Sequence, residues 1–120
     1  MTFINKLKPT NDSIKISQVM PFDENITFRI FKGIQVNDDL WISIQASYGH
    51  YCNPRKTLKD LSEYNSMEFA LRDKEGNFLS VTDVLPNFPK LKEIEEYYED
   101  TVYGYVPVNL IEDLVQVLSI

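Results

Sequence analysis

Apolar and polar residues alternate most regularly in the middle of the chain, over residues 40–48 (LWISIQASY). Two sets interleave there: Ile42, Ile44, Ala46 and Tyr48 on one side, and Trp41, Ser43, Gln45 and Ser47 on the other. Successive side chains of a strand point to opposite faces, so this pattern turns one set toward a core and the other toward water. Residues 40–48 are therefore predicted to form a half-buried strand.

Weaker strand patterns precede this segment. Residues 13–22 (SIKISQVMPF) alternate loosely through Ile14 and Ile16, which indicates an early strand. Residues 25–36 (NITFRIFKGIQV) are rich in β-branched and aromatic side chains, which favour extended structure. Residues 1–12 show neither pattern, and we expect an irregular N-terminal arm there.

A hairpin and a further strand are predicted downstream. Residues 66–81 (SMEFALRDKEGNFLSV) are typical of a hairpin, because Gly76 can adopt the positive φ that a tight turn needs. Residues 101–107 (TVYGYVP) predict a short aromatic strand that Pro107 ends. Both segments fit an antiparallel sheet.

Helical spacing appears only in the last third of the chain. Residues 108–120 repeat apolar side chains every three or four positions, with Asn109 available as an N-cap. Residues 90–100 (KLKEIEEYYED) predict a short acidic helix that Pro89 opens. Together the elements predict one α+β domain over residues 1–120, with an antiparallel sheet of about five to six strands and the C-terminal helix packed on one face.

Charge is distributed unevenly along the 120 residues, whose formal net charge is −6. Residues 1–40 carry five cations and five anions, whereas residues 81–120 carry two cations and eight anions. Such an acidic half disfavours direct binding to nucleic acid or to anionic lipid and favours a basic protein partner. The N-terminal sequence MTFINKLKPTNDS lacks an apolar core, and no run of 18 apolar residues occurs, so neither a secretion signal nor a membrane span is expected.

The loop after the central strand collects rare residues, among them the chain's only histidine, His50, and its only cysteine, Cys52. A metal needs three or four ligands; Asp60 or Glu63 could complete a mixed site, but at a spacing that matches no familiar pattern. Catalysis would need His50 to activate Cys52, with Arg55 as a further group. We expect instead a structural loop with a buried cysteine, no metal, no cofactor and no catalytic residue.

Two groups of residues are candidate contacts for a protein partner. The first is an acidic, tyrosine-rich set, whose alternative role is a merely solvated helix face: Glu93, Glu95, Glu96, Tyr97, Tyr98, Glu99, Asp100 and Tyr103. The second is the loop set: Tyr48, His50, Tyr51, Arg55 and Lys56. Its cations could instead form ion pairs with acidic residues of the same domain, such as those of residues 93–100. Tyrosines favour the contact role, because they offer large area at low entropic cost.

Residues 40–118 also carry a family resemblance. The stretches ISIQAS, YGHYCNPR, YNSMEFAL and TVYGYVPVNLIEDLV resemble a group of small, mostly uncharacterised proteins encoded by bacteriophages and prophages. Members often end in His-Gly-Gly, whereas this chain ends in VLSI. The resemblance implies a cytoplasmic protein of a bacterial host cell, and small acidic phage proteins include host-defence inhibitors such as anti-CRISPR proteins.

Taken with the charge layout, the resemblance predicts a non-enzymatic inhibitor that binds a basic host protein such as a nuclease. Two alternatives stay open: a small enzyme that uses Cys52, His50 and Arg55, and a virion structural or assembly protein.

Overall fold

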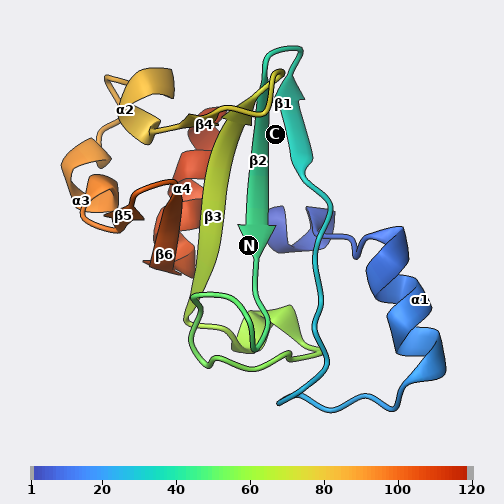
Figure 1. Cartoon of the computed structure of the whole chain (residues 1–120). Coiled ribbons are helices and arrows are strands. Elements are labelled where there is room, and N and C mark those ends of the chain that lie inside the picture. Colours follow the sequence, from blue (N-terminus) through green and yellow to red (C-terminus); the bar gives the residue numbers. More distant parts are fainter. Residues whose placement is uncertain (1, 119–120) are drawn as a thin grey trace.

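The protein is an α+β fold built on an antiparallel sheet, and the computed structural model describes residues 2–118 (Figure 1). Within that range the strands are β1 Ile34–Asn37, β2 Leu40–Gln45, β3 Ser66–Asp73, β4 Phe78–Leu79, β5 Tyr98–Glu99 and β6 Val102–Pro107. Their order across the sheet is β1-β2-β3-β6-β5, and β4 pairs with β3 off this path. The predicted fold class is confirmed.

The described helices are α1 Asn11–Val19, α2 Val81–Val84, α3 Leu91–Glu95 and α4 Val108–Leu118, with short 3-10 turns η1 Phe3–Lys6 and η2 Leu61–Glu63. Figure 1 shows α4 behind the sheet, while α1 stands to one side and the front of the sheet is uncovered. Among residues 2–118, none of the helices has the length and apolar character that a membrane-spanning helix needs.

The core forms between α4 and one face of the two central strands. In the register of β2 and β3, Ile42 lies opposite Leu71 and Ile44 lies opposite Phe69. These side chains are buried together with others of the cluster: Met67, Val106, Leu110, Ile111, Leu114 and Val115. The alternation predicted for residues 40–48 is therefore confirmed as far as Ile44. Beyond it the prediction is wrong, because Gln45 and Ser47 are buried and Tyr48 is 37% exposed.

The predicted hairpin over residues 66–81 is also confirmed. β3 and β4 pair through Leu71 with Leu79 and through Arg72 with Phe78. Gly76 has a φ of 85°, in the left-handed region that glycine adopts without strain.

The first residues are not the irregular arm that the sequence predicted. Phe3 lies in η1 and is 0% exposed, and Leu7 is 5% exposed, so both belong to the core. Thr2 reaches α4, where its Oγ1 donates a hydrogen bond to Glu112 at 2.8 Å. Two well-placed apolar side chains are enough to dock this segment, although they are too few to produce a periodic pattern.

The strand predicted over residues 13–22 is wrong, because most of that segment is α1. Thr10 begins the helix as its N-cap, and its side chain accepts a hydrogen bond from the backbone N–H of Ser13 at 3.2 Å. Ile14 and Ile16, which the prediction placed on one side of a strand, are 41% and 44% exposed on the helix. The N-cap at Thr10 therefore favours the helix more strongly than the loose alternation favours a strand.

The strand predicted over residues 25–36 is present only at its end, where β1 begins at Ile34. The preceding residues form only an isolated backbone bridge, between Phe31 and Pro9, and a side chain of β2 supplies further hydrogen bonds. Gln45 accepts a hydrogen bond from the N–H of Phe31 at 2.8 Å and donates one to its carbonyl at 2.9 Å. Buried side-chain amides of this kind leave no trace in a hydrophobic pattern.

The predicted C-terminal helix is confirmed as α4, except for its cap. The helix begins at Val108, so Asn109 lies inside its first turn and does not precede it. Ser119 and Ile120, the end of the predicted segment, lie outside the described residues.

Truncating the helix at its centre should destabilise the domain. Leu114 is 0% exposed, so Leu114→Ala is expected to lower the free energy of unfolding by about 2–5 kcal/mol. Val117→Ala, at a position that is 47% exposed, should change it by less than about 0.5 kcal/mol. Urea denaturation measures both, and a loss below about 0.5 kcal/mol for Leu114→Ala would show that α4 is not docked as described.

Candidate functional site

The acidic segment, defined as residues 93–100, lies on α3 and β5 rather than on one continuous helix. Ile94 is 0% exposed and anchors α3, which ends at Glu95. The chain then forms β5, which pairs with β6 through Tyr98 opposite Tyr103. The helix predicted over residues 90–100 is thus shorter than expected, because strand pairing replaces its second half.

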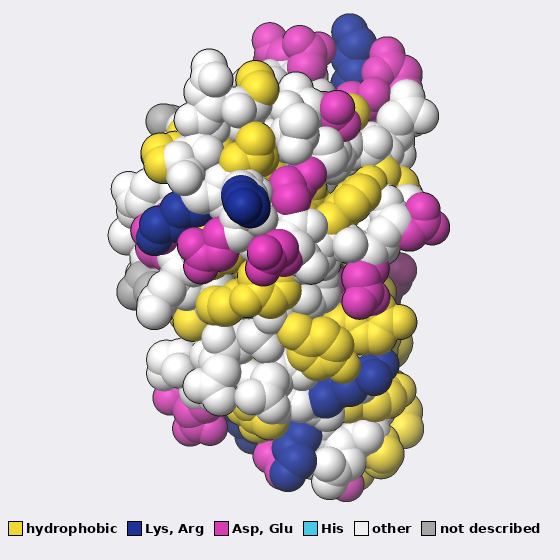
Figure 2. Space-filling view, turned by 90° about the vertical axis from the view of Figure 1, so that its left-hand side faces the viewer, with side chains coloured by type: hydrophobic (Ala, Val, Ile, Leu, Met, Phe, Trp, Pro, Cys, Tyr) yellow, Lys and Arg dark blue, Asp and Glu magenta, His cyan; other side chains and the backbone are white. Residues whose placement is uncertain are grey.

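Most of the acidic segment faces solvent. Its exposed residues are Glu93, Glu96, Tyr98, Glu99 and Asp100, while Glu95 and Tyr97 are half-buried. Figure 2 shows the side of the molecule that carries α3 and β5: acidic side chains spread over its middle and upper parts, and hydrophobic ones, a class that includes tyrosine, emerge between and below them. The segment is therefore available to a partner.

No salt bridge within 4.0 Å among residues 2–118 joins the acidic segment to a cation. The salt bridges found there are Lys56 with Glu24, Lys74 with Asp39, and Lys90 with Asp113. Lys56 and Arg55 of the loop do not pair with the acidic segment. Lys56 pairs with Glu24, and Arg55 donates from its Nε to the carbonyl of Tyr48 at 3.2 Å. The negative charge of the segment is left to solvent or to a partner.

Tyr103 was predicted as a contact residue, and this is wrong, because it is 0% exposed. Its ring stacks on that of Phe69, with centroids 4.4 Å apart and planes 3° apart. Its hydroxyl accepts a hydrogen bond from the N–H of Val81 at 2.8 Å and donates one to Glu95. Burial and the neighbouring Glu95 carboxylate raise the pKa of Tyr103, so the hydroxyl keeps its proton. Tyr103 is a core residue.

Glu95 also has a mainly internal role. One carboxylate oxygen accepts from Tyr103, and the other accepts from the hydroxyl of Thr82 at 2.9 Å. The carboxylate therefore links α3 to α2. Sequence reasoning missed α2, although Ser80 and Asp83 form the capping box that opens it.

A bulge in β6 brings a tyrosine to the surface that sequence reasoning had left out. Along β3, Met67 pairs with Val106 and Phe69 pairs with Tyr103, so β6 contains one extra residue between these pairs. Tyr105 sits in this bulge with a φ of 55° and is 47% exposed. Strict alternation would have buried it with Tyr103; a glycine inside a strand, here Gly104, is the sequence feature that marks a bulge.

The bulge brings two residues of the loop set, Tyr51 and Arg55, beside the acidic segment. Tyr105 donates its N–H to the carbonyl of Tyr51 at 2.9 Å, and the two rings lie 5.8 Å apart. Arg55 lies over the Tyr51 ring at 5.2 Å. Gly104 donates its N–H to Tyr97 at 3.2 Å, which connects this group to the acidic segment. We call Tyr51, Tyr105 and Arg55 the tyrosine cluster.

The remaining loop residues of the predicted set face a different neighbour. Phe28 stacks on His50 with centroids 5.2 Å apart and meets Tyr48 edge-on at 5.9 Å. Lys56 is held by Glu24, so it also belongs to this side of the loop. Tyr48, His50 and Lys56 are therefore not brought together with the acidic segment.

Cys52 and His50 do not form an activated pair. The thiol is 1% exposed and donates to the carbonyl of Ser47 at 3.2 Å, while Nδ1 of His50 is 2.7 Å from the Ser47 hydroxyl. Burial raises the pKa of the Cys52 thiol, so it is protonated at neutral pH and a poor nucleophile. In the part of the chain that the structure describes, no group of three or more His, Cys, Asp or Glu residues could hold a metal ion.

Comparisons with known proteins find no matching family model, no matching curated protein and no matching solved structure. The fold and the surface together define an α+β domain with an acidic, tyrosine-bearing face. The phage resemblance of residues 40–118 stays a prediction.

Removing the Tyr103 hydroxyl should test its structural role. In Tyr103→Phe the buried N–H of Val81 loses its acceptor, so the free energy of unfolding should fall by about 1–3 kcal/mol. Tyr98→Phe, at a ring that is 37% exposed, should change it by less than about 0.5 kcal/mol. Equal effects of the two variants in urea denaturation would contradict the hydrogen bonds assigned to the Tyr103 hydroxyl.

His50 should make stability depend on pH. Burial, with Arg29 and Arg55 nearby, lowers its pKa from the usual 6.5 to about 4. The unfolded chain therefore binds more protons between these values, and stability falls as the pH drops from 6.5 toward 4. His50→Gln should lose less stability over this range than the unaltered protein in urea denaturation. The carboxylates titrate in both proteins, so identical pH profiles would show that the imidazole is not shielded.

Proposed function

We propose that this protein is a non-enzymatic inhibitor that binds a host protein through the acidic segment and the tyrosine cluster. The partner would present a basic groove that normally holds nucleic acid, as in a nuclease. The observation that carries the proposal is the row of exposed carboxylates that no cation of the described chain pairs with: Glu93, Glu96, Glu99 and Asp100.

Charge supports this kind of partner. Carboxylates spaced along a surface can occupy the Lys and Arg side chains that otherwise contact phosphates. The same charge repels nucleic acid itself, so the protein would compete with nucleic acid for the partner rather than bind it.

The exposed tyrosines support a protein contact. Tyr51, Tyr98 and Tyr105 are between 37% and 47% exposed, and Arg55 lies beside the first of them. Tyrosine and arginine are among the side chains enriched at the residues that dominate binding energy. Tyr105 also holds a left-handed φ of 55°, a cost that proteins concentrate at functional sites.

The origin and the lack of enzymatic activity are parts of the same proposal. The resemblance to phage and prophage proteins supports action on a bacterial host protein, as anti-CRISPR and other defence inhibitors act. The buried, protonated thiol of Cys52 supports a binding role over cysteine-dependent catalysis.

Neutralising the segment should slow association with the partner. The immobilised protein captures its partner from a bacterial lysate, and surface plasmon resonance then measures the complex at low and high salt. The triple variant Glu96→Gln, Glu99→Gln, Asp100→Asn should associate about tenfold more slowly at low salt, because long-range attraction is lost. Tyr98→Ala should mainly speed dissociation, because it removes a desolvated anchor.

A charge-matched control separates the segment from net charge. Asp38→Asn, Glu63→Gln, Glu75→Gln removes the same number of exposed carboxylates elsewhere and should leave both rates within about twofold. Duplex nucleic acid should displace the protein from the partner. A salt-independent affinity with a fully active triple variant, or simultaneous binding of nucleic acid and protein, would refute the proposal.

A further inference from the structure

Helix α1 projects from the domain and is held mainly at its first turn. The N–H of Thr10 donates to the carbonyl of Ile30 at 2.9 Å, and the Ser13 hydroxyl accepts from the N–H of Ile30 at 2.9 Å. No residue of the helix is buried. A nine-residue helix is marginal in water without packing, so this exposed helix needs a further surface to cover it.

Most of the large apolar side chains that the described chain exposes lie on α1 and on the segment that follows it. We call them the apolar patch: Ile14, Ile16, Val19, Met20, Phe22, Ile26, Phe28 and Ile30. Their exposed fractions range from 37% at Phe28 to 80% at Val19. The largest apolar patch on a typical monomer measures about 300–600 Å² and is often a functional contact.

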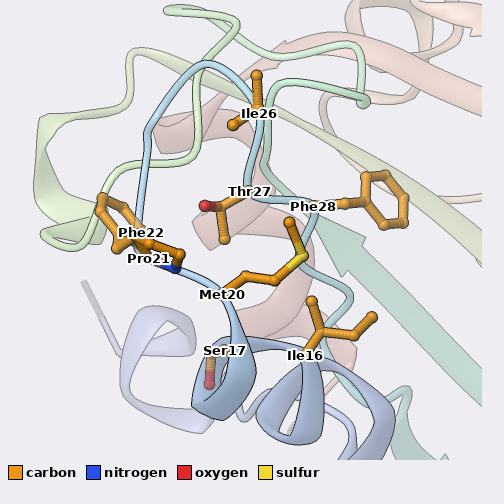
Figure 3. Close-up of a pocket in the computed structure, with 8 residues that line it drawn as sticks. All are labelled: Ile16, Ser17, Met20, Pro21, Phe22, Ile26, Thr27 and Phe28. Atoms are coloured by element: carbon orange, nitrogen blue, oxygen red, sulfur yellow. The ribbon is translucent and has the colours of Figure 1, made fainter.

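The patch has both a hollow and a protruding side chain. A cavity of about 120 Å³ opens between the end of α1 and residues 26–28. In Figure 3, Met20 runs across this hollow between the rings of Phe22 and Phe28. Val19, the most exposed apolar side chain of the patch, directly precedes Met20. A two-fold interface pairs the same surface of both copies. Each copy must therefore present both a protruding side chain and a hollow that can receive it.

Charge favours a second copy of this chain as the occupant. Residues 1–40, which contain the patch, carry five cations and five anions and are neutral overall. The whole excess of −6 lies in residues 41–120. Lys59 of the neighbouring loop also lies over the Phe22 ring at 4.6 Å. Two copies can still meet through the patch without the repulsion that their acidic segments would cause.

The size of the patch also suits a dimer. A large apolar side chain offers roughly 60–120 Å² of apolar surface, so eight of them about half exposed offer roughly 250–500 Å². One partner of a standard interface contributes about 800 Å², of which somewhat over half is apolar. We propose that the apolar patch is the interface of a homodimer, in which Val19 of each copy packs against the hollow of the other. The acidic segments stay free on such a dimer.

Sedimentation equilibrium on the full chain tests this proposal. Over about a hundredfold range of micromolar concentrations, the unaltered protein should reach twice the mass of one chain. Val19→Asp and Ile16→Asp should each weaken dimerisation by at least about tenfold, because every dimer would bury two unpaired charges. Val117→Asp, a matched change at an exposed valine outside the patch, should leave the dimer intact. Urea denaturation checks that each variant is folded.

The outcomes that overturn the proposal are equally definite. A protein that stays monomeric over the whole range has no such interface. A dimer that survives both aspartate variants uses another surface. If the protein is monomeric and sediments with dioleoylphosphatidylcholine vesicles, and Val19→Asp abolishes this, the patch binds lipid instead. The variant Glu96→Gln, Glu99→Gln, Asp100→Asn changes only the acidic segment and should dimerise normally. Loss of the dimer and loss of partner binding can therefore be told apart.

Discussion

The buried hydroxyl of Tyr103 ties the candidate surface to the rest of the fold. It accepts from the N–H of Val81 and donates to Glu95, so one side chain of β6 holds both α2 and α3. Its ring stacks on Phe69 of the central strand. Because α3 is a short helix with one fully buried residue, Ile94, these hydrogen bonds add to its packing in fixing the position of the helix. The exposed carboxylates that follow α3 are therefore positioned in part by the Tyr103 hydrogen bonds.

Backbone strain next to Tyr103 shapes the other half of that surface. The extra residue in β6 lets both Tyr103 and Val106 point inward, and it turns Tyr105 outward beside Tyr51. A Cβ on Gly104 would lie 3.1 Å from the Cβ of Tyr51, so the loop packs closely over the bulge. One irregularity in the sheet thus places a loop residue and a strand residue together.

Side-chain hydrogen bonds supplement an isolated backbone bridge, Pro9 with Phe31, on the opposite side of the molecule. Arg29 donates to the carbonyls of Leu58 and Ala46 at 2.7 Å and to the hydroxyl of Tyr64 at 3.2 Å. With Gln45, it holds the extended segment before β1 against the long loop. Phe31 of that segment is buried, but Ile26, Phe28 and Ile30 stay exposed, so this side of the molecule presents a second surface, chemically unlike the acidic one.

The sequence pattern was enough to locate the central strand, the β3–β4 hairpin, β6 and α4, because their strand, turn and helix signals lie within each segment. It did not show the bulge inside β6. Charge counting likewise located the acidic excess, since formal charge does not depend on folding. The strand predicted at α1 failed because a cap at Thr10 and bonds to Ile30 stabilise a helix that buries nothing. Tyr103 was predicted as a contact but is buried, whereas Tyr105, which was given no role, faces solvent, because a bulge set by the register with β3 separates the two. Such register shifts and buried polar bonds join residues far apart in the chain, and a linear pattern carries no record of them.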